Sequence, residues 1–418
     1  MRGVKRILGR SFWRDRKGNA LVILTASLPL LIGAAGLAVD TAKWTYWKRQ
    51  LQREADSAAL AGAFAKAQSK DAIAAANSDL ARTNVITLSS PANITNAPTT
   101  GAFTGNADAV RVILSTAQRL PFSGSFMSAA PTITASATAM VVTTTPYCGL
   151  ALSGGTATGI TMTGNATLNL GCGIASNSTS STAAVVAGGS SSIFASPVAA
   201  VGALPTSGNY ASGTQLLAYS LPQPDPFASL PTPAPSGCQG QVKVKSTDTA
   251  TLTAGCYKGM DIKGTLSLQA GIYYIDGDSF SVGSQAVVTG TGVTIILTSS
   301  NAATQPQSIA TLDVNAGATI QLSAPTSGTY HGVLFYQDRR AQDSSVNKLN
   351  GNATSTLQGA IYFPSQELDF SGTSGMTTTC IQLVALRLTF IGNTTVSNSC
   401  PPGSGASAFN GIQVRLVE

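Results

Sequence analysis

The hydrophobic positions divide the chain into unlike stretches. Residues 20–39, ALVILTASLPLLIGAAGLAV, run for twenty residues without a charge. At about 1.5 Å per residue such a helix would cross a hydrocarbon core of about 30 Å. Residues 40–83 contain no proline, and apolar or small side chains recur there at intervals of three and four, the helical spacing: Trp44, Trp47, Leu51, Ala55, Ala58 and Gly62. We therefore expect one helix that spans a membrane over residues 20–39 and continues as a stalk over residues 40–83.

Beyond the stalk the periodicity changes to short β-prone runs. Residues 84–145 hold two such runs separated by Pro, Gly and Ser, which predicts a small β domain. A helix followed by a small antiparallel sheet resembles the architecture of minor pilins, so we expect this domain to be pilin-like. In residues 146–418 short strands alternate with Gly, Asn, Asp and Ser, a pattern typical of either a sandwich or a parallel β-helix. Residues 264–271, 283–292 and 314–322 look like successive rungs, each burying its apolar face on the next.

The predicted fold class is thus mainly β with an N-terminal transmembrane helix. A helical stalk and a small α+β part precede a β-solenoid (parallel β-helix-like) body. Within that body the Pro-rich residues 222–235 interrupt the strands, which indicates a semi-rigid surface excursion.

The charge of the chain is concentrated at its N-terminus. Residues 1–56 hold eleven Lys/Arg against four Asp/Glu, and the remainder holds fourteen of each. A nucleic-acid partner is not expected, because no basic face repeats along the folded part. The basic residues 1–19 indicate a cytoplasmic N-terminus by the positive-inside rule, with the body on the opposite side of the membrane. The alternative is a cleaved signal peptide, but the apolar run is longer than such peptides need and passes directly into helix-forming sequence.

Six cysteines lie on the far side of the apolar segment: Cys148, Cys172, Cys238, Cys256, Cys380 and Cys400. An even number confined to one side favours disulfides in an oxidising compartment, and fifteen pairings are open. The simplest is Cys148–Cys172, Cys238–Cys256 and Cys380–Cys400, in which each loop of roughly 20 residues would contribute about 3 kcal/mol. No metal site is expected, because there is no C-x-x-C and His331 is the only histidine.

Residues 14–63 carry several features in a fixed order. A basic run ends in Lys17-Gly18-Asn19, and the apolar helix ends in GLAV before Asp40. The aromatic residues Trp44 and Trp47 follow, and then the helix QLQREADSAALAGA. This arrangement resembles the N-terminal region of TadE/TadG-like Flp pilus-assembly proteins. We expect Lys17, Gly18, Asp40, Trp44 and Trp47 to lie at the membrane interfaces.

The resemblance implies a component of Flp (Tad) pilus assembly, anchored in a bacterial inner membrane by a single span with its C-terminal body in the periplasm. Some members of the family are cut after the glycine of the basic run and have a glutamate at the fifth mature position, where this chain has Ile23. That departure favours the TadG-like branch, which keeps its anchor. Other TadG-like members carry a von Willebrand A domain with a D-x-S-x-S metal site. Residues 369–376 resemble it only superficially, because 42 residues after Met376 are too few to complete such a domain.

An enzyme is the main competing class, because carbohydrate-cleaving enzymes also use β-helices. The candidate carboxylates are Asp276, Asp278, Asp313 and the Asp338 of Asp338-Arg339-Arg340, for which turn formation is the simpler role. We therefore expect no catalytic residue, no cofactor and a non-enzymatic protein. The expected partners are the inner membrane and other Tad proteins, with a homo- or hetero-oligomer through the stalk helix as an option. A surface adhesin or polysaccharide-binding protein is the alternative function.

Overall fold

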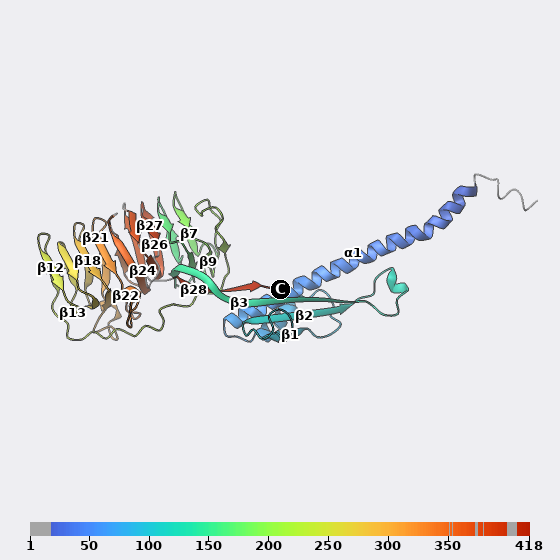
Figure 1. Ribbon diagram of the computed structural model, residues 1–418, viewed down its shortest axis with the longest axis horizontal. Coiled ribbons are helices and arrows are strands. Elements are labelled where there is room, and N and C mark those ends of the chain that lie inside the picture. Colours follow the sequence, from blue (N-terminus) through green and yellow to red (C-terminus); the bar gives the residue numbers. More distant parts are fainter. Residues whose placement is uncertain (1–17, 351, 353, 373–374, 379, 399–407) are drawn as a thin grey trace, which may run out of the picture. The chain divides into compact units, whose positions relative to one another are not determined.

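The computed structural model describes residues 18–350, 352, 354–372, 375–378, 380–398 and 408–418. The chain forms two compact units. We call Met1–Val142 with Val414–Glu418 the N-terminal unit, and Thr143–Gln413 the β body. The prediction of a mainly β protein with one long N-terminal apolar helix is confirmed (Figure 1).

The N-terminal unit has two helices, α1 (Gly18–Ala67) and α2 (Ala72–Thr83). The expectation of a single helix through residue 83 is wrong. Ser69 adopts a φ of +56°, and the Asp71 carboxylate accepts hydrogen bonds from the backbone N–H groups of Ile73 and Ala74 at 2.9 and 3.1 Å. Because a carboxylate at this position satisfies the first N–H groups of a new helix, it favours a restart over continuation.

A small antiparallel sheet packs on these helices. Strand β1 (Asn93–Asn96) pairs with β2 (Ala109–Ala117), and β2 pairs with the first part of β3 (Thr132–Ala151). The core joins the alanine-rich face of α1 and α2 to the inner side of the sheet, and its members include Leu51, Ala55, Ala59, Val112 and Leu114. The alanine stripe of the stalk is therefore an intramolecular packing face. A short 3-10 helix, η1 (Ser123–Ser125), lies in the β2–β3 loop.

In the β body most strands pair in parallel with the strand three places further along the chain, and they form three columns. The first column contains β11 (Val242–Val244), β14 (Met260–Ile262), β17 (Ser279–Val282), β20 (Thr311–Val314), β23 (Val346–Leu349), parts of β24 (Thr356–Gly372) and β26 (Cys380–Gly392), β4 (Ile160–Met162) and β7 (Val185–Ala187).

The second column contains β12 (Thr249–Leu252), β15 (Thr265–Leu268), β18 (Val287–Thr291), β21 (Thr319–Ser323) and the start of β24. A separate four-stranded sheet holds β25 (Gly375–Thr378), β27 (Thr395–Asn398), β5 (Thr167–Asn169) and β8 (Ser192–Phe194).

The third column contains β13 (Gly255–Tyr257), β16 (Gly271–Asp276), β19 (Val293–Thr298), β22 (Val333–Gln337), parts of β24, β26 and β3, β6 (Gly173–Ser176), β9 (Val198–Ala200) and β10 (Leu216–Leu217). The remaining elements are η2 (Pro306–Ser308) and β28 (Phe409–Leu416).

Successive strands of a column place aliphatic residues in line with one another. One such ladder follows the first column through Val244, Ile262, Val282, Val314 and Leu349, all of which are buried. In the first-column strands β14, β17 and β20, alternate residues are buried and join one continuous core. The third-column strands β19 and β22 are instead buried along their whole length.

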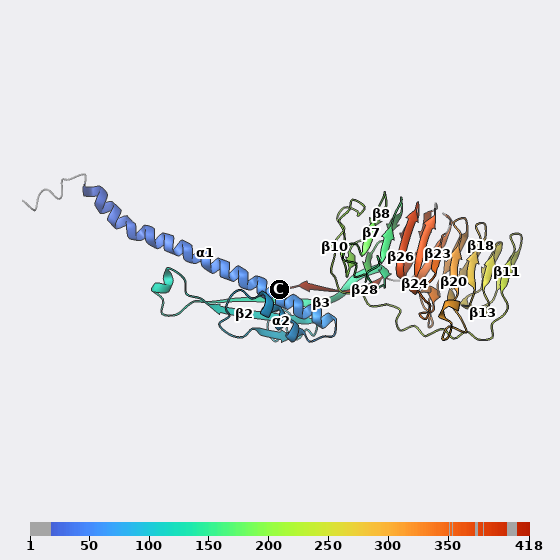
Figure 2. The same ribbon diagram turned by 180° about the vertical axis from the view of Figure 1, so that it is seen from behind.

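Within the first and third columns, the order of the strands in space differs from their order along the chain. The strands from β3 to β10 form one run, and residues 218–241 then lead to β11, which Figure 2 shows at the opposite end of the body. The second run returns from β11 to β26, and β26 pairs with β3 and β4 of the first run. The Pro-rich segment is thus the connection between two runs that share one core.

Candidate functional site

The N-terminal half of α1 is apolar and exposed. Within the described part of the chain, one helix, Val22–Ala67, is long and apolar enough to cross a membrane. The apolar stretch of this helix is not buried inside the protein: Leu30 is 75% exposed and Leu24 is 63% exposed. Such a surface is unfavourable in water and suits a hydrocarbon environment.

The predicted interface residues have different surroundings. Lys17 lies outside the described residues, and Gly18 is the first residue of α1. Trp44 is 45% exposed, whereas Trp47 is half-buried against the core of the N-terminal unit. Asp40, directly after the apolar run, is only 4% exposed.

Asp40 binds the loop between β2 and β3. One carboxylate oxygen accepts the Phe122 N–H at 2.9 Å, and the other accepts the Ser123 N–H at 2.6 Å. Burial raises the pKa of Asp40, but the hydrogen bonds from Ser123 and Phe122 outweigh it and hold that pKa below its ordinary value. The carboxylate therefore stays charged and closes the N-terminus of η1.

The same loop covers Gly36, one turn before Asp40. A Cβ at Gly36 would overlap the Phe122 ring, so only glycine permits this approach. The sequence analysis did not single out Phe122 or its loop. The available signal was the apolar run LPFSGSFM at residues 120–127, which has no acidic residue and interrupts two alternating strands.

The helix that carries this geometry also carries the family resemblance. Residues 18–68 match the family model described as putative Flp pilus-assembly TadE/G-like. This TadE/G-like segment coincides with α1, which ends at Ala67. No curated protein and no solved structure matches the chain. The TadE/G-like segment, its apolar helix and the disulfides described next fit a membrane-anchored Tad component.

The structure contains two of the predicted disulfides, Cys148–Cys172 and Cys238–Cys256, with Cα–Cα distances of 5.8 and 4.4 Å. Cys380 is also disulfide-bonded, and Cys400, its predicted partner, lies outside the described residues. The Cys238–Cys256 bond ties the segment before β11 to β13, at the end where the second run of strands begins.

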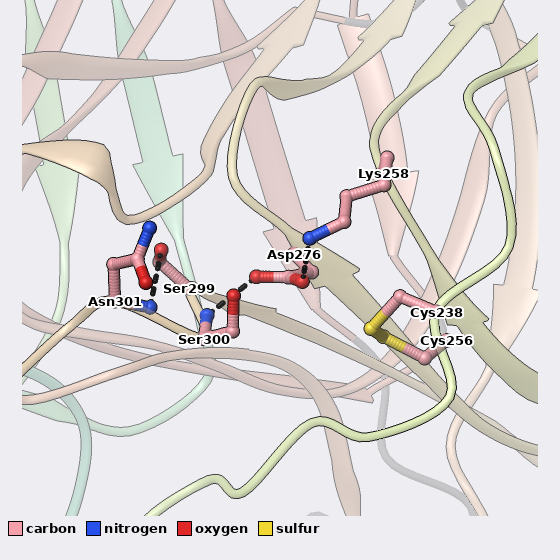
Figure 3. Close-up of a disulfide and its surroundings, with 7 residues drawn as sticks. All are labelled: Cys238, Cys256, Lys258, Asp276, Ser299, Ser300 and Asn301. Carbon is pink, nitrogen blue, oxygen red and sulfur yellow. Dashed lines mark hydrogen bonds and ion pairs between the residues drawn. A yellow bond between two sulfur atoms is a disulfide. The ribbon is translucent and has the colours of Figure 1, made fainter.

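Asp276 lies beside that disulfide (Figure 3). Its buried carboxylate accepts the Lys258 ammonium at 2.5 Å and the Ser300 N–H at 2.5 Å. Burial raises the pKa of Asp276, but the hydrogen bonds from Lys258 and Ser300 outweigh it and lower that pKa. These contacts hold the end of β16 against its neighbours.

The ligand atoms of Asp276, Cys238 and Cys256 lie within 4.8 Å of one another, the spacing of a metal site. The chemistry does not fit a metal ion. The two sulfurs are bonded to each other, so neither is the thiolate that binds metals, and the carboxylate already has two donors.

The other candidate carboxylates are dispersed. Asp278, at a φ of +57°, accepts a hydrogen bond from Gln241 Nε2 at 2.8 Å. Asp313 is exposed beside Lys348 on the next strand. Asp338 is buried and pairs with Arg340 at 2.5 Å. Asp369 lies within strand β24. In the part of the chain that the structure describes, these carboxylates form no group of three whose oxygens lie within 4.8 Å of one another.

Arg339 holds the Pro-rich connection to the body. Its guanidinium donates to the backbone oxygens of Phe227 and Leu230, the latter at 2.8 Å. It also donates to the Tyr362 hydroxyl at 2.8 Å, which in turn donates to Asp225 at 2.6 Å. The Arg339 Cζ lies 5.3 Å from the centre of the Tyr362 ring. The expected excursion is therefore fixed to the third column.

Proposed function

We propose that this protein is a membrane-anchored, non-enzymatic component of Flp (Tad) pilus assembly that projects a disulfide-bonded β body into the periplasm. The observation that carries the proposal is the coincidence on α1 of the TadE/G-like match and an exposed apolar segment. The other end of the same helix packs on the sheet of the N-terminal unit. One helix thus serves as both anchor and scaffold.

The proposed orientation is N-terminus in the cytoplasm, across the inner membrane. It is supported by the excess of Lys/Arg before residue 18 and by disulfides confined to the far side of the apolar segment. For the body we propose a β-solenoid, which is supported by parallel pairing at intervals of three strands and by the stacked aliphatic ladder.

The proposal of a non-enzyme is supported by the roles of the candidate carboxylates. Asp276 and Asp338 are occupied by Lys258 and Arg340, and Asp278 lies at a turn. The proposed partners are other Tad components, and the part of α1 just past the apolar run offers them a surface. An open groove of about 660 Å³ there is lined by α1 residues that include Thr41, Thr45 and Arg49.

A surface adhesin that binds polysaccharide is the second candidate. It is favoured by a shallow polar cavity of about 280 Å³ on the second column, lined by residues that include Thr289, Gln321 and Thr356. Hydroxyl and amide groups on a flat sheet could hydrogen-bond sugars.

Deletion of the gene separates the two functions. We expect an assembly factor to be encoded among a secretion ATPase, a prepilin peptidase and a major pilin, and its loss to abolish pili in electron micrographs. Loss of adhesion with intact pili would instead support the adhesin. Complementation with the full chain is the control.

Protease treatment of spheroplasts tests the orientation. Antibodies to both ends should detect digestion of the body and survival of the N-terminus, and the undigested protein should keep its full size. A soluble mature chain that lacks residues 1–39 would contradict the anchor.

A further inference from the structure

The loop between β2 and β3 is unusually apolar for an exposed turn. Residues 118–131, QRLPFSGSFMSAAP, contain Arg119 as their only charged residue. Phe126 is 79% exposed and Met127 is 44% exposed. Exposed aromatic and thioether side chains at a loop tip usually mark a contact surface, because their burial is favourable.

The position of the loop along α1 is fixed by three contacts. Asp40 accepts the N–H groups of Phe122 and Ser123, and the Phe122 ring lies on Gly36. Gly36 is three residues before Val39, the last residue of the apolar run. At about 1.5 Å per residue, the Phe122 ring lies about one helical turn inside the apolar segment.

The exposed side chains of the loop continue the apolar surface of the helix. Phe126 packs edge-on against Phe122, with ring centroids 5.5 Å apart. On α1, Leu37 and Val39 are 58% and 50% exposed at the same level. Figure 1 shows the β2–β3 loop beside α1 on the side toward the apolar end of the helix.

We propose that this loop is a second membrane contact, which enters the interfacial layer of the leaflet at the C-terminal end of the apolar segment. Phe126 and Met127 would lie at the boundary between headgroups and acyl chains, and the exposed Arg119 would reach lipid phosphates. The proposal rests on the proposed anchoring of α1. The physical argument is continuity: a membrane that covers Leu37 also covers a ring packed on Gly36.

A second membrane contact would fix the rotation of the N-terminal unit about the axis of α1. A single span can rotate about its own axis, whereas a loop inserted beside it fixes which face of the N-terminal unit points to the membrane. Asp40 is then a positioning residue, because it holds the loop at the depth of the last apolar turn.

The test is depth measurement with a nitroxide on a single added cysteine. Native thiols should not compete for the label, since no free cysteine is present in the described part of the chain. The full-length protein carrying Met127→Cys is labelled without reductant in vesicles of phosphatidylethanolamine and phosphatidylglycerol. Collision rates with oxygen and with a water-soluble nickel chelate are then compared.

Two matched labels make the outcome interpretable. Leu30→Cys reports on the span, and Thr104→Cys reports on an exposed loop at the other end of β2. We expect the oxygen-to-nickel ratio at Met127 to exceed that at Thr104 several-fold and to approach that at Leu30.

A water-like ratio at Met127 with a lipid-like ratio at Leu30 would overturn the second contact and leave the anchor intact. In that case the exposed side chains of the loop would be assigned to contact with a protein partner. A water-like ratio at Leu30 would overturn the anchor itself and, with it, the loop contact that depends on it.

Discussion

Two buried aspartates show how single residues set local structure in this chain. Asp40 and Asp276 both accept backbone N–H groups, and each has its pKa held below the ordinary value by hydrogen bonds that outweigh burial. Asp276 also has a cationic partner, Lys258, whereas the hydrogen bonds that lower the pKa of Asp40 come from the uncharged residues Phe122 and Ser123. Both carboxylates therefore remain charged and join segments distant in sequence.

Asp40→Ala should free the β2–β3 loop. Arg119 is the only Lys or Arg between Arg111 and Lys243, so tryptic cleavage in the loop gives one recognisable pair of fragments. We expect cleavage after Arg119 in detergent micelles to be several-fold faster in the variant. The reason is that the backbone N–H groups of Phe122 and Ser123 lose the carboxylate oxygens that accept their hydrogen bonds. Asp108→Ala, at an exposed aspartate, is the control and should behave like the wild type. An unchanged rate in Asp40→Ala would show that Phe122 packing alone holds the loop.

Asp276 should make the stability of the protein depend on pH. Its pKa is lower in the folded chain than in the unfolded chain, where it is about 3.9. The stabilisation is therefore complete above that unfolded pKa and is lost as the pH falls through the folded pKa. Asp276→Asn should remove this dependence and lower the unfolding free energy at pH 7 by about 1–3 kcal/mol.

The unfolding free energies of the wild type and of Asp276→Asn are measured by denaturant unfolding, which is monitored by circular dichroism. The measurement is repeated at several pH values between pH 2 and pH 7, the range in which carboxylates titrate. The difference in unfolding free energy between wild type and Asp276→Asn should shrink at the acidic end. A difference that stays constant with pH would mean that the Lys258 contact contributes nothing through charge.

At the scale of elements, Arg339 is the centre of the contacts that hold the Pro-rich connection, and Tyr336 and Arg340 add hydrogen bonds to the backbone oxygens of Pro231 and Pro233. Arg339 donates to Phe227 and Leu230 and stacks on Tyr336 and Tyr362. A lysine keeps the charge but cannot reproduce this fork or the stacking. The planar geometry of the Arg339 guanidinium, rather than its positive charge alone, therefore holds the segment that joins the two runs of strands.

Arg339→Lys should loosen the connection while the columns persist. We expect faster chymotryptic cleavage after Phe227 and an unchanged circular dichroism spectrum, because the aliphatic ladders do not involve Arg339. Arg387→Lys, at an arginine paired with Asp343 and Glu367, is the matched control. If both variants were cleaved equally fast, general destabilisation would explain the result.

At the scale of the whole molecule, two separate cores predict two unfolding transitions. The core of the N-terminal unit contains no cysteine, whereas the Cys148–Cys172 and Cys238–Cys256 disulfides lie in the β body. Reduction should lower the stability of the body by about 3 kcal/mol for each loop that it opens. The transition of the N-terminal unit should not move.

Calorimetry of the full chain in detergent, with and without dithiothreitol, checks this prediction. The double variant Cys238→Ser with Cys256→Ser should shift the body transition alone and in the same direction. One common transition that moves as a whole would show that the two units unfold together.

The sequence by itself determined the features that depend on local pattern. The uncharged run over residues 20–39 requires a long apolar helix, and alternating short runs require β structure. It also indicated the two observed disulfides, because short loops make neighbouring cysteines the simplest partners. The TadE/G-like match rests on the same N-terminal residues.

Only the tertiary structure decided the features that depend on long-range contacts. The break before α2, the docking of Phe122 on Gly36 and the binding of the Pro-rich segment by Arg339 join residues that no local pattern pairs. The order of the strand columns, in which β26 pairs with β3 and β4, is likewise a property of the packed chain. The physical reason is that the hydrophobic period and the residue propensities of a segment determine whether it forms a helix or a strand. Which elements pack beside it depends on burial of apolar surface across the whole chain.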